Sequence, residues 1–358
     1  MEQVIMKGNE AVAEAAVRAG CRYYFSYPIT PQTEINEYMA RRMPEAGGVF
    51  VQAESEIGAI NMVFGASGAG GRAMTSSSSP GIALKQEGIT YLAGSELPAV
   101  IINIARGGPG IGSIQGAQSD YFQSVKGGGN GDYHVIVLAP YSVQEFADLT
   151  TLAFELADRW RNPVIVLGDG VIAQMMEPVR VPPFQDHVPD KPWAVNGARR
   201  ELGRGSNLVH SAYMVPEDLE RHNIRLQAKY RDAAEWEVRF EESMTEDAEL
   251  VLVAYGISAR ICETVLEKAR ERGMKLGLLR PITLWPFPTA RLRELARKVP
   301  RFLCVELSAG QMVEDVRLAV NGAAAVTHFG RMGSVVHTPE EVLERAAGLL
   351  CRQGGETS

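Results

Sequence analysis

Short apolar runs rich in β-branched and aromatic residues alternate with helical patterns through the first 175 residues, and this alternation constrains the fold more than any other feature. Two of the runs, AVIINIA and HVIVLA, are apolar at almost every position, as strands covered on both faces are. We therefore expect an α/β fold with a parallel sheet and helices on both of its faces. The expected strands are 22–26, 48–52, 72–75, 99–105, 134–139 and 163–167, with helices near 8–19, 32–42, 56–69, 81–93 and 142–159.

A second alternation, which begins at Glu249, predicts a smaller α/β domain. Its strands are ELVLVAYG, KLGLL and RFLCVEL, and its helices lie at 258–272 and near 288–298. A last helix begins at Thr338-Pro339-Glu340-Glu341, which has a capping Thr, a Pro in the first turn and Glu three residues after the cap.

The segment between the two alternations has a different composition. Prolines accumulate from Pro178 to about Trp193, which predicts a linker or extended arm without regular structure. Residues 216–243 then predict one long, heavily charged connector helix. We accordingly divide the chain into residues 1–177, an arm and connector helix at 178–246, and a second domain at 247–358.

The composition excludes several classes of protein. A net charge of −7 without a basic cluster argues against nucleic acid as a partner. No apolar run reaches the roughly 18 residues of a membrane span, and the amino terminus has no signal-peptide pattern. The four cysteines are far apart and form no C-x-x-C pair, so we expect neither a disulfide framework nor an iron–sulfur cluster held by this chain alone. A reducing cytoplasm is the expected setting.

Ligands of open parallel sheets bind beyond the carboxyl ends of the strands. The segments that follow the first four strands are YPITP at 27–31, ESE at 54–56, SSSSPG at 76–81 and RGGPG at 106–110. Together they offer a hydroxyl, carboxylates, a serine-rich turn and an arginine. The expected site lies where these four loops meet.

Each of these residues also has a structural interpretation. Carboxylates at the start of a helix stabilise its dipole, and this is the favoured interpretation of Glu54. Glu56 precedes an apolar helix that we expect to be packed, where a partly desolvated carboxylate would be suited to proton transfer. Arg106 is either a paired ion at the edge of the core or an anion clamp. The serine run is either a plain loop or a ligand contact.

Two matches to known motifs lack the order of helices and strands that each motif requires. GAGGRA at 68–73 fits a loose dinucleotide pattern, but it follows a helix and precedes a strand, the reverse of the required order. Gly168-Asp169-Gly170 with Asn196 resembles the magnesium motif of thiamine diphosphate enzymes in spacing, but the proline-rich arm fills the interval. We interpret this second match as a coincidence, so that the metal and the diphosphate would belong to another chain.

At the expected site the sequence resembles a known family. YPITPQTE, ESEIGAINMVFGA, SSSSPG, RGGPGIGSIQGAQSDYFQ and KGGGNGDYHVIVLAPYSVQE are similar to the α subunit of 2-oxoacid:ferredoxin oxidoreductases, most of all those of the 3-methyl-2-oxobutanoate (2-ketoisovalerate) and 2-oxoglutarate group. LRPITLWPFP and CVELSAGQM resemble the second domain of the same subunit. The resemblance implies a pyrimidine-binding domain of the thiamine diphosphate fold, followed by a domain like the transketolase carboxyl-terminal domain.

The resemblance also implies roles for individual residues. Glu56 would be the catalytic glutamate that contacts thiamine diphosphate, while Thr30 and Arg106 would bind the substrate. Ser79, Gln118 and Asp120 would contribute to cofactor binding.

The same resemblance implies partners. A β subunit would carry the diphosphate and Mg²⁺ half of the site and an iron–sulfur cluster, and γ and ferredoxin-like δ subunits would complete the electron path to ferredoxin. The implied reaction converts a 2-oxoacid and coenzyme A to an acyl-CoA and CO₂.

Several alternatives stay open. The GGPGIG segment after Arg106 replaces the GPSTG of some relatives, which leaves the acyl chain undecided between 3-methyl-2-oxobutanoate, 2-oxoglutarate and an arylpyruvate. A 2-oxoglutarate site needs a second cation near the acyl end of the substrate, and Lys126, which follows the AQSDYF stretch, is the nearby basic residue. A non-catalytic scaffold of an electron-transfer complex is the alternative from a different class, and retention of Glu56, Thr30 and Arg106 together argues against it.

Overall fold

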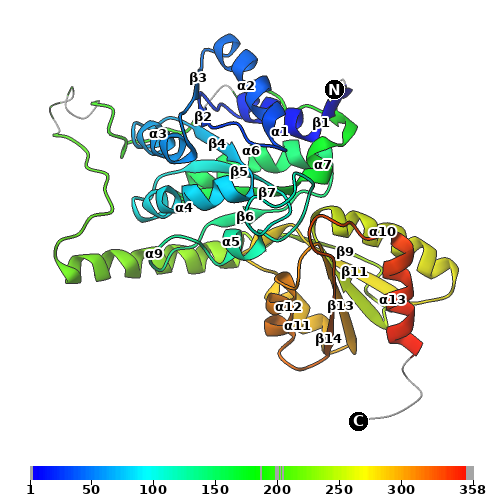
Figure 1. The fold of residues 1–358 in the computed structure, drawn as a ribbon. Helices are drawn as coiled ribbons and strands as arrows, with labels where there is room; N and C mark the ends of the chain where they lie inside the picture. The colour runs from blue at the N-terminus through cyan, green and yellow to red at the C-terminus, as the bar shows by residue number, and fades with distance from the viewer. Residues whose placement is uncertain (1–2, 186–187, 198–200, 202, 204, 352–358) are drawn as a thin grey trace.

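Two α/β units make up the molecule, and the long helix α9 (Pro216–Trp236) runs along the first of them and leads into the second (Figure 1). The computed structural model describes residues 3–185, 188–197, 201, 203 and 205–351. None of the helices in this described part is both long and apolar enough to cross a membrane.

The first unit is built on a seven-stranded sheet of order β12-β6-β7-β5-β4-β2-β3, in which β2 to β7 are parallel. Each predicted strand of this unit is present, although several differ in length from the prediction. The strands are β2 (Tyr23–Ser26), β3 (Val49–Gln52), β4 (Ala73–Ser77), β5 (Ala99–Ala105), β6 (Ile136–Leu138) and β7 (Pro163–Asp169).

Helices cover both faces of this sheet, as the apolar strands predict (Figure 1). Each face has its own buried cluster of apolar side chains, one under α3 and α4 and the other under α1, α2 and α6. The helices span α1 (Gly8–Arg18), α2 (Thr33–Glu45), α3 (Glu56–Gly68), α4 (Ser79–Gly94) and α6 (Val143–Trp160).

Two predictions about the middle of the chain are wrong. The proline-rich arm was expected to lack regular structure, yet its start belongs to β8 (Met176–Arg180), which pairs antiparallel with β1 (Gln3–Lys7) and crosses the division placed after residue 177. Pro178 is accommodated because this is a separate two-stranded ladder, in which every strand is an edge.

The connector helix also ends earlier than expected, at Trp236 rather than at residue 243. The buried carboxylate of Glu237 accepts hydrogen bonds from Trp160 Nε1 (2.8 Å) and Arg159 Nη1 (3.0 Å), at the point where the chain leaves the helix. Phe240–Ser243 then forms β9, which pairs antiparallel with β11.

The second unit has a five-stranded sheet of order β14-β13-β10-β11-β9. The predicted capping box of its last helix is present: the Glu341 N–H donates to Thr338 Oγ1 (3.2 Å) and the Thr338 N–H donates to Glu341 Oε2 (2.9 Å). β14, α12 and the short helices α5 (Tyr121–Val125) and α7 (Gly170–Gln174) were not predicted. The elements are β10 (Leu250–Val253), β11 (Leu276–Pro281), β13 (Arg301–Glu306), β14 (Ala325–Gly330), α10 (Gly256–Glu271), α11 (Thr289–Leu295), α12 (Met312–Val320) and α13 (Pro339–Cys351).

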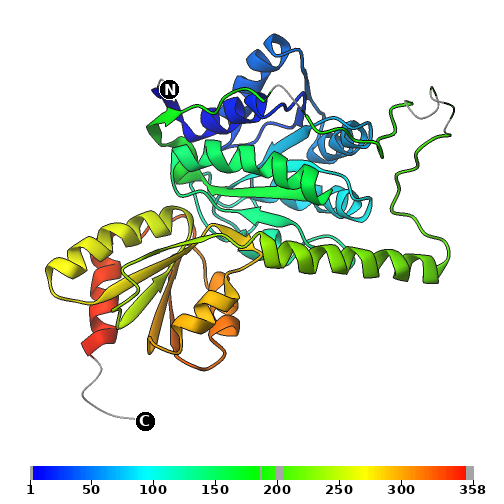
Figure 2. The same cartoon turned by 180° about the vertical axis from the view of Figure 1, so that it is seen from behind.

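One strand of the chain's second half belongs to the first sheet. β12 (Thr283–Trp285) follows β11 and pairs antiparallel with β6, so it forms the edge of the seven-stranded sheet. The view from behind shows the two units meeting beside the end of α9 (Figure 2). The two units are therefore joined through a shared sheet as well as through side-chain contacts.

Candidate functional site

The guanidinium of Arg106 joins two of the four loops that the sequence places at the carboxyl edge of the first sheet. Its Nη1 donates to the Thr30 carbonyl (2.8 Å) and its Nη2 to the Ile111 carbonyl (3.1 Å). The side chain is only 7% exposed, and its Nε is buried without a hydrogen-bond partner in the described part of the chain. Arg106 thus keeps a buried donor that an anion could use.

The turn that carries Thr30 is fixed through its backbone. The Thr30 carbonyl accepts from Arg106, and the Pro31 carbonyl accepts from Asn9 Nδ2 (2.8 Å) and Gln174 Nε2 (3.0 Å). Thr30 itself is exposed, and its hydroxyl forms no hydrogen bond with the residues that the structure describes. The turn therefore has a fixed backbone and an exposed hydroxyl that is open to a ligand.

Ser79, Asn103 and Asp120 form a buried polar cluster next to Arg106. The Ser79 hydroxyl accepts from the Arg106 N–H (2.9 Å), and Asn103 Nδ2 donates to Asp120 Oδ2 (3.0 Å). Burial raises the pKa of the Asp120 carboxyl, against the opposing effect of its hydrogen bonds to Ser79 and Asn103. Asn103 was not predicted, although a lone amide inside the apolar strand AVIINIA was a signal for it.

Glu56 is the first residue of α3, whose N-cap Ser55 accepts a hydrogen bond from the Gly58 N–H (3.1 Å). The Glu56 side chain is 7% exposed, and its carboxylate has no hydrogen bond or ion pair to the described residues. A Cβ atom at Gly81 would lie 2.6 Å from Glu56 Oε1, so the absence of a side chain there makes room for the carboxylate. A buried carboxylate in this condition is suited to a hydrogen-bonding ligand, whereas Glu54 is exposed at the surface.

The structure places Gln118 in the contact between the two units. Its Nε2 donates to the Tyr255 carbonyl (2.7 Å), and its Oε1 accepts from Ser258 Oγ (2.8 Å) and the Leu307 N–H (3.0 Å). Its amide therefore joins the two units, and the contact with the cofactor stays a prediction for this residue.

Asp169, from the Gly-Asp-Gly segment, is used in the same way. Its Oδ1 accepts from the N–H groups of Val171 and Ile172 (both 3.1 Å), and its Oδ2 accepts from the Ile257 N–H (3.0 Å). Asp169 thus caps α7 and ties the second unit to the first. Both carboxylate oxygens are engaged with backbone groups, and the interpretation of the motif as a coincidence stays a prediction.

A cavity of about 700 Å³ adjoins the polar cluster and lies between the two units. The first unit contributes Ser79 and Asp120 to its lining, and the second contributes residues 307–309, Gln311 and Met332. Its lining in the described structure includes no lysine or arginine.

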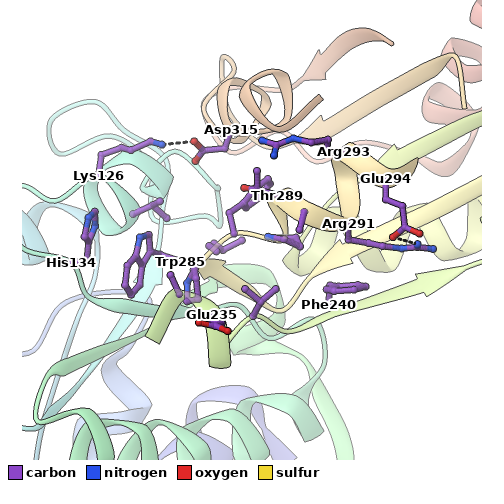
Figure 3. Close-up of a pocket in the computed structure, with 18 residues that line it drawn as sticks. Lys126, His134, Glu235, Phe240, Trp285, Thr289, Arg291, Arg293, Glu294 and Asp315 are labelled. Carbon is purple, nitrogen blue, oxygen red and sulfur yellow. Dashed lines mark hydrogen bonds and ion pairs between the residues drawn. The ribbon is translucent and has the colours of Figure 1, made fainter. Parts of the chain in front are cut away.

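A larger cavity, of about 950 Å³, lies on another part of the contact between the units (Figure 3). It contains none of the six residues predicted for the site, whereas Ser79 and Asp120 line the smaller cavity. We therefore place the site beside the smaller cavity, although Thr30, Glu56, Arg106 and Gln118 are outside its lining. Lys126 lines the larger cavity, where its ammonium is paired with Asp315 on α12 (Figure 3). It is therefore not available as a second cation in the smaller cavity.

Comparison with known proteins agrees with this geometry. Residues 14–242 match the family model described as pyruvate flavodoxin/ferredoxin oxidoreductase, thiamine diphosphate-binding, and residues 248–342 match the model of pyruvate:ferredoxin oxidoreductase core domain II. The chain belongs to the 2-oxoacid:ferredoxin oxidoreductase family, as an α subunit with a thiamine diphosphate-binding domain. The predicted family is thus confirmed.

Individual relatives cover nearly the whole chain. Ketoisovalerate oxidoreductase subunit VorB of Methanothermobacter marburgensis is 53% identical over 96% of this chain and 97% of its own length. The 2-oxoglutarate synthase subunit KorA of Methanothermobacter thermautotrophicus is 38% identical over the same shares of the two chains.

Solved structures support the fold. The 2-oxoglutarate:ferredoxin oxidoreductase of Magnetococcus marinus has a TM-score of 0.86 at 26% identity, over 97% of this chain and 65% of that longer chain. A split-gene transketolase, at 14% identity, covers 97% of this chain and 98% of its own with a TM-score of 0.60, which shows the fold alone. The predicted thiamine diphosphate fold with a transketolase-like second domain is confirmed.

Proposed function

We propose that this subunit serves the oxidative decarboxylation of a branched 2-oxoacid, 3-methyl-2-oxobutanoate, with coenzyme A, to an acyl-CoA and CO₂, with the electrons passing to ferredoxin. The observation that carries the choice of substrate is the cavity lined by Ser79 and Asp120, whose lining includes no lysine or arginine among the described residues, Arg106 itself lying outside it. A neutral, branched acyl chain fits such a lining, whereas 2-oxoglutarate brings a second carboxylate that would be left unpaired. The 53% identity with a ketoisovalerate oxidoreductase subunit supports the same choice.

Thiamine diphosphate, when bound, would supply the electron sink that decarboxylation of a 2-oxoacid requires. Glu56 fits this cofactor because its buried carboxylate lacks a partner and faces the space left by Gly81. Glu56 would hydrogen-bond a ring nitrogen of the aminopyrimidine and so control the position of its proton.

Arg106 and Thr30 would hold the substrate. The unpaired Nε of Arg106 would donate to the carboxylate of the 2-oxoacid, and the Thr30 hydroxyl would donate to its keto oxygen. Because both groups are fixed to the same turn, they would restrict the orientation of the carboxylate that is lost as CO₂.

An exposed apolar surface on α3 and α4 supports a partner chain beside the cofactor site. Ile57 on α3 and Leu84 and Tyr91 on α4 are 40–51% exposed although they are large and apolar. Such a surface is typical of a subunit contact. We assign it to the β subunit, which would carry the diphosphate and Mg²⁺ half-site and an iron–sulfur cluster, with γ and δ subunits completing the path to ferredoxin.

The proposed location is the cytoplasm. The four cysteines are all free thiols, three of them buried, which suits a reducing compartment.

The test is an assay of the subunit purified with its partners against a panel of 2-oxoacids and a low-potential electron acceptor. We expect the highest kcat/KM for 3-methyl-2-oxobutanoate and at least about tenfold less for 2-oxoglutarate, because the second carboxylate would be desolvated without a counter-ion. A preference for 2-oxoglutarate or an arylpyruvate would overturn the choice of substrate. Absence of turnover with every 2-oxoacid would favour the alternative function, a non-catalytic scaffold of an electron-transfer complex.

Arg106→Gln and Lys126→Gln provide a matched pair of charge removals. Arg106→Gln should raise the KM for the 2-oxoacid by about tenfold or more, because a charged hydrogen bond is lost. Lys126→Gln should leave KM and substrate preference unchanged, because Lys126 is paired with Asp315. Equal effects of the two variants would contradict the assigned position of the substrate.

A further inference from the structure

Ile111 connects the arginine expected to bind the substrate with the smaller cavity. Its carbonyl accepts a hydrogen bond from Arg106 Nη2 (3.1 Å), and the residue lines the cavity of about 700 Å³. Ile111 is also 84% exposed. A single exposed aliphatic residue is ordinary in itself, but this one lies in a cavity and next to the group expected to bind a carboxylate. Its side chain is therefore available to the rest of a ligand whose carboxylate Arg106 binds.

The loop that carries Ile111 is closed at its base. The Gly107 N–H donates to the Gln115 carbonyl (3.0 Å), and Ser334 Oγ of the second unit donates to the same carbonyl (2.8 Å). Gly112 has a φ of +58°, and a Cβ atom there would lie 1.8 Å from the Gly107 carbonyl oxygen, so the turn after Ile111 requires glycine. These contacts limit the positions that Ile111 can take.

Met332 lines the same cavity from the second unit and is 65% exposed. The residues that follow it lie against the base of the loop: a Cβ atom at Gly107 would lie 2.3 Å from Ser334 Oγ and 3.3 Å from the carbonyl carbon of Gly333. Met332 and Ile111 thus belong to two segments in contact, one from each unit, that border one cavity.

The other aliphatic residues of the lining offer little free surface. Leu307 is 1% exposed, while Ala83 and Ala309 have only a methyl group. Ile111 and Met332 are accordingly the large aliphatic side chains with free surface in the described lining, which includes no lysine or arginine. An acyl chain that enters this cavity would meet apolar carbon and no positive charge.

We propose that Ile111 and Met332 are specificity-determining residues that contact the acyl chain of the 2-oxoacid and select a neutral, branched chain. This inference rests on the proposed function, in which Arg106 binds the substrate carboxylate. The methyl groups of a branched chain would be buried between two apolar side chains, and each buried methyl group contributes to affinity. A second carboxylate in the same place would lose its water without gaining a counter-ion.

The test uses Ile111→Ala and Met332→Ala in the assembled complex, with 3-methyl-2-oxobutanoate and pyruvate as probes. The acyl chain of pyruvate is a single methyl group, so it reaches fewer of the proposed contacts. We expect the ratio of kcat/KM for 3-methyl-2-oxobutanoate over pyruvate to fall about tenfold in each variant, the size expected for lost hydrophobic contacts with a methyl group. Both residues are exposed, so neither change should unfold the subunit.

Ile114→Ala is the matched control. Ile114 lies on the same loop and is 57% exposed, but it is not part of the cavity lining, so its variant should keep the native ratio. A native ratio in Ile111→Ala or in Met332→Ala, or an equal fall in Ile114→Ala, would overturn the proposal. Failure of the proposed function is distinguishable, since the native complex would then turn over neither 2-oxoacid, and this inference would be overturned with it.

Met332→Lys tests the selection against charge. A lysine at this position would add a cation to the lining, so we expect kcat/KM for 2-oxoglutarate to rise about tenfold over the native complex, because the second carboxylate gains a charged partner. Ile114→Lys adds the same charge outside the lining and should not produce this rise. No rise in Met332→Lys, or the same rise in Ile114→Lys, would overturn the assignment of Met332 to the acyl chain.

Discussion

The loop edge of the first sheet and the contact between the two units differ in whether their buried polar side chains have hydrogen-bond partners. In the contact, the amide of Gln118 and the carboxylate of Asp169 have each of their groups matched to a backbone or hydroxyl partner. At the loop edge, Arg106 Nε is buried without a partner, and the Glu56 carboxylate, on a residue 7% exposed, has no hydrogen bond or ion pair in the described structure. Matched polar groups stabilise a fold, whereas unmatched ones cost stability unless a ligand completes them. The difference distinguishes Gln118 and Asp169 from Glu56 and Arg106.

Glu56→Gln gives the largest test of this difference. We expect 2-oxoacid-dependent acceptor reduction by the complex to fall about 10²–10⁴-fold, because the amide cannot transfer a proton to or from the cofactor. The melting temperature of the subunit should not fall, since the carboxylate has no hydrogen bond or ion pair within the described structure. Glu54→Gln, an exposed neighbour, is the control, and equal activities of the two variants would remove Glu56 from the mechanism.

Gln118→Ala should show the opposite behaviour. Truncation leaves the Leu307 N–H, the Ser258 hydroxyl and the Tyr255 carbonyl without this partner, which should cost about 2–4 kcal/mol. The measurement is urea-induced unfolding of the subunit, with the exposed Gln115→Ala as control. If the variant instead keeps the native stability and loses affinity for the cofactor, Gln118 would belong to the binding site.

Thr30→Ala should have a smaller effect, confined to the substrate. Its hydroxyl has no partner in the described chain, while the turn is fixed through backbone carbonyls, so stability should not change. We expect the KM for the 2-oxoacid to rise about three- to tenfold, the range of one neutral hydrogen bond. Thr30→Ser keeps the hydroxyl and should restore the native KM. An unchanged KM in the Ala variant would leave Thr30 as a plain turn residue.

Asp120→Asn should show the smallest effect on stability among the variants expected to change it. Because burial raises the pKa of Asp120, the folded state favours the protonated acid, and native stability falls as pH rises from the unfolded pKa through the folded one. Asparagine does not titrate, so the variant should gain in melting temperature over the native chain as pH rises from 4 to 7. A difference in melting temperature that does not widen would mean that the hydrogen bonds of Asp120 offset the cost of burying its carboxylate.

The sequence predicts the parts of this comparison that depend on strand order. Uniformly apolar strands require burial on both faces, and the carboxyl ends of parallel strands meet at one edge, which is enough to bring Arg106 to the turn that carries Thr30. Elements stabilised by distant partners were missed. β1 is stabilised by pairing with β8, and β9 by pairing with β11. The side-chain amide of Gln118 has hydrogen-bond partners more than a hundred residues away. Local pattern carries no information about such pairs.

The short strand β12 limits how this protein could have been assembled or divided. Residues that follow β11 of the second unit close the edge of the first unit's sheet beside β6. A gene cut after residue 246 would leave the backbone groups of β6 uncovered, and such an edge invites association with other chains. Exchange of the second unit between relatives would have to carry a matching edge strand with it. The sheet of the first unit thus depends on a strand that follows β11, even though each unit has a sheet of its own.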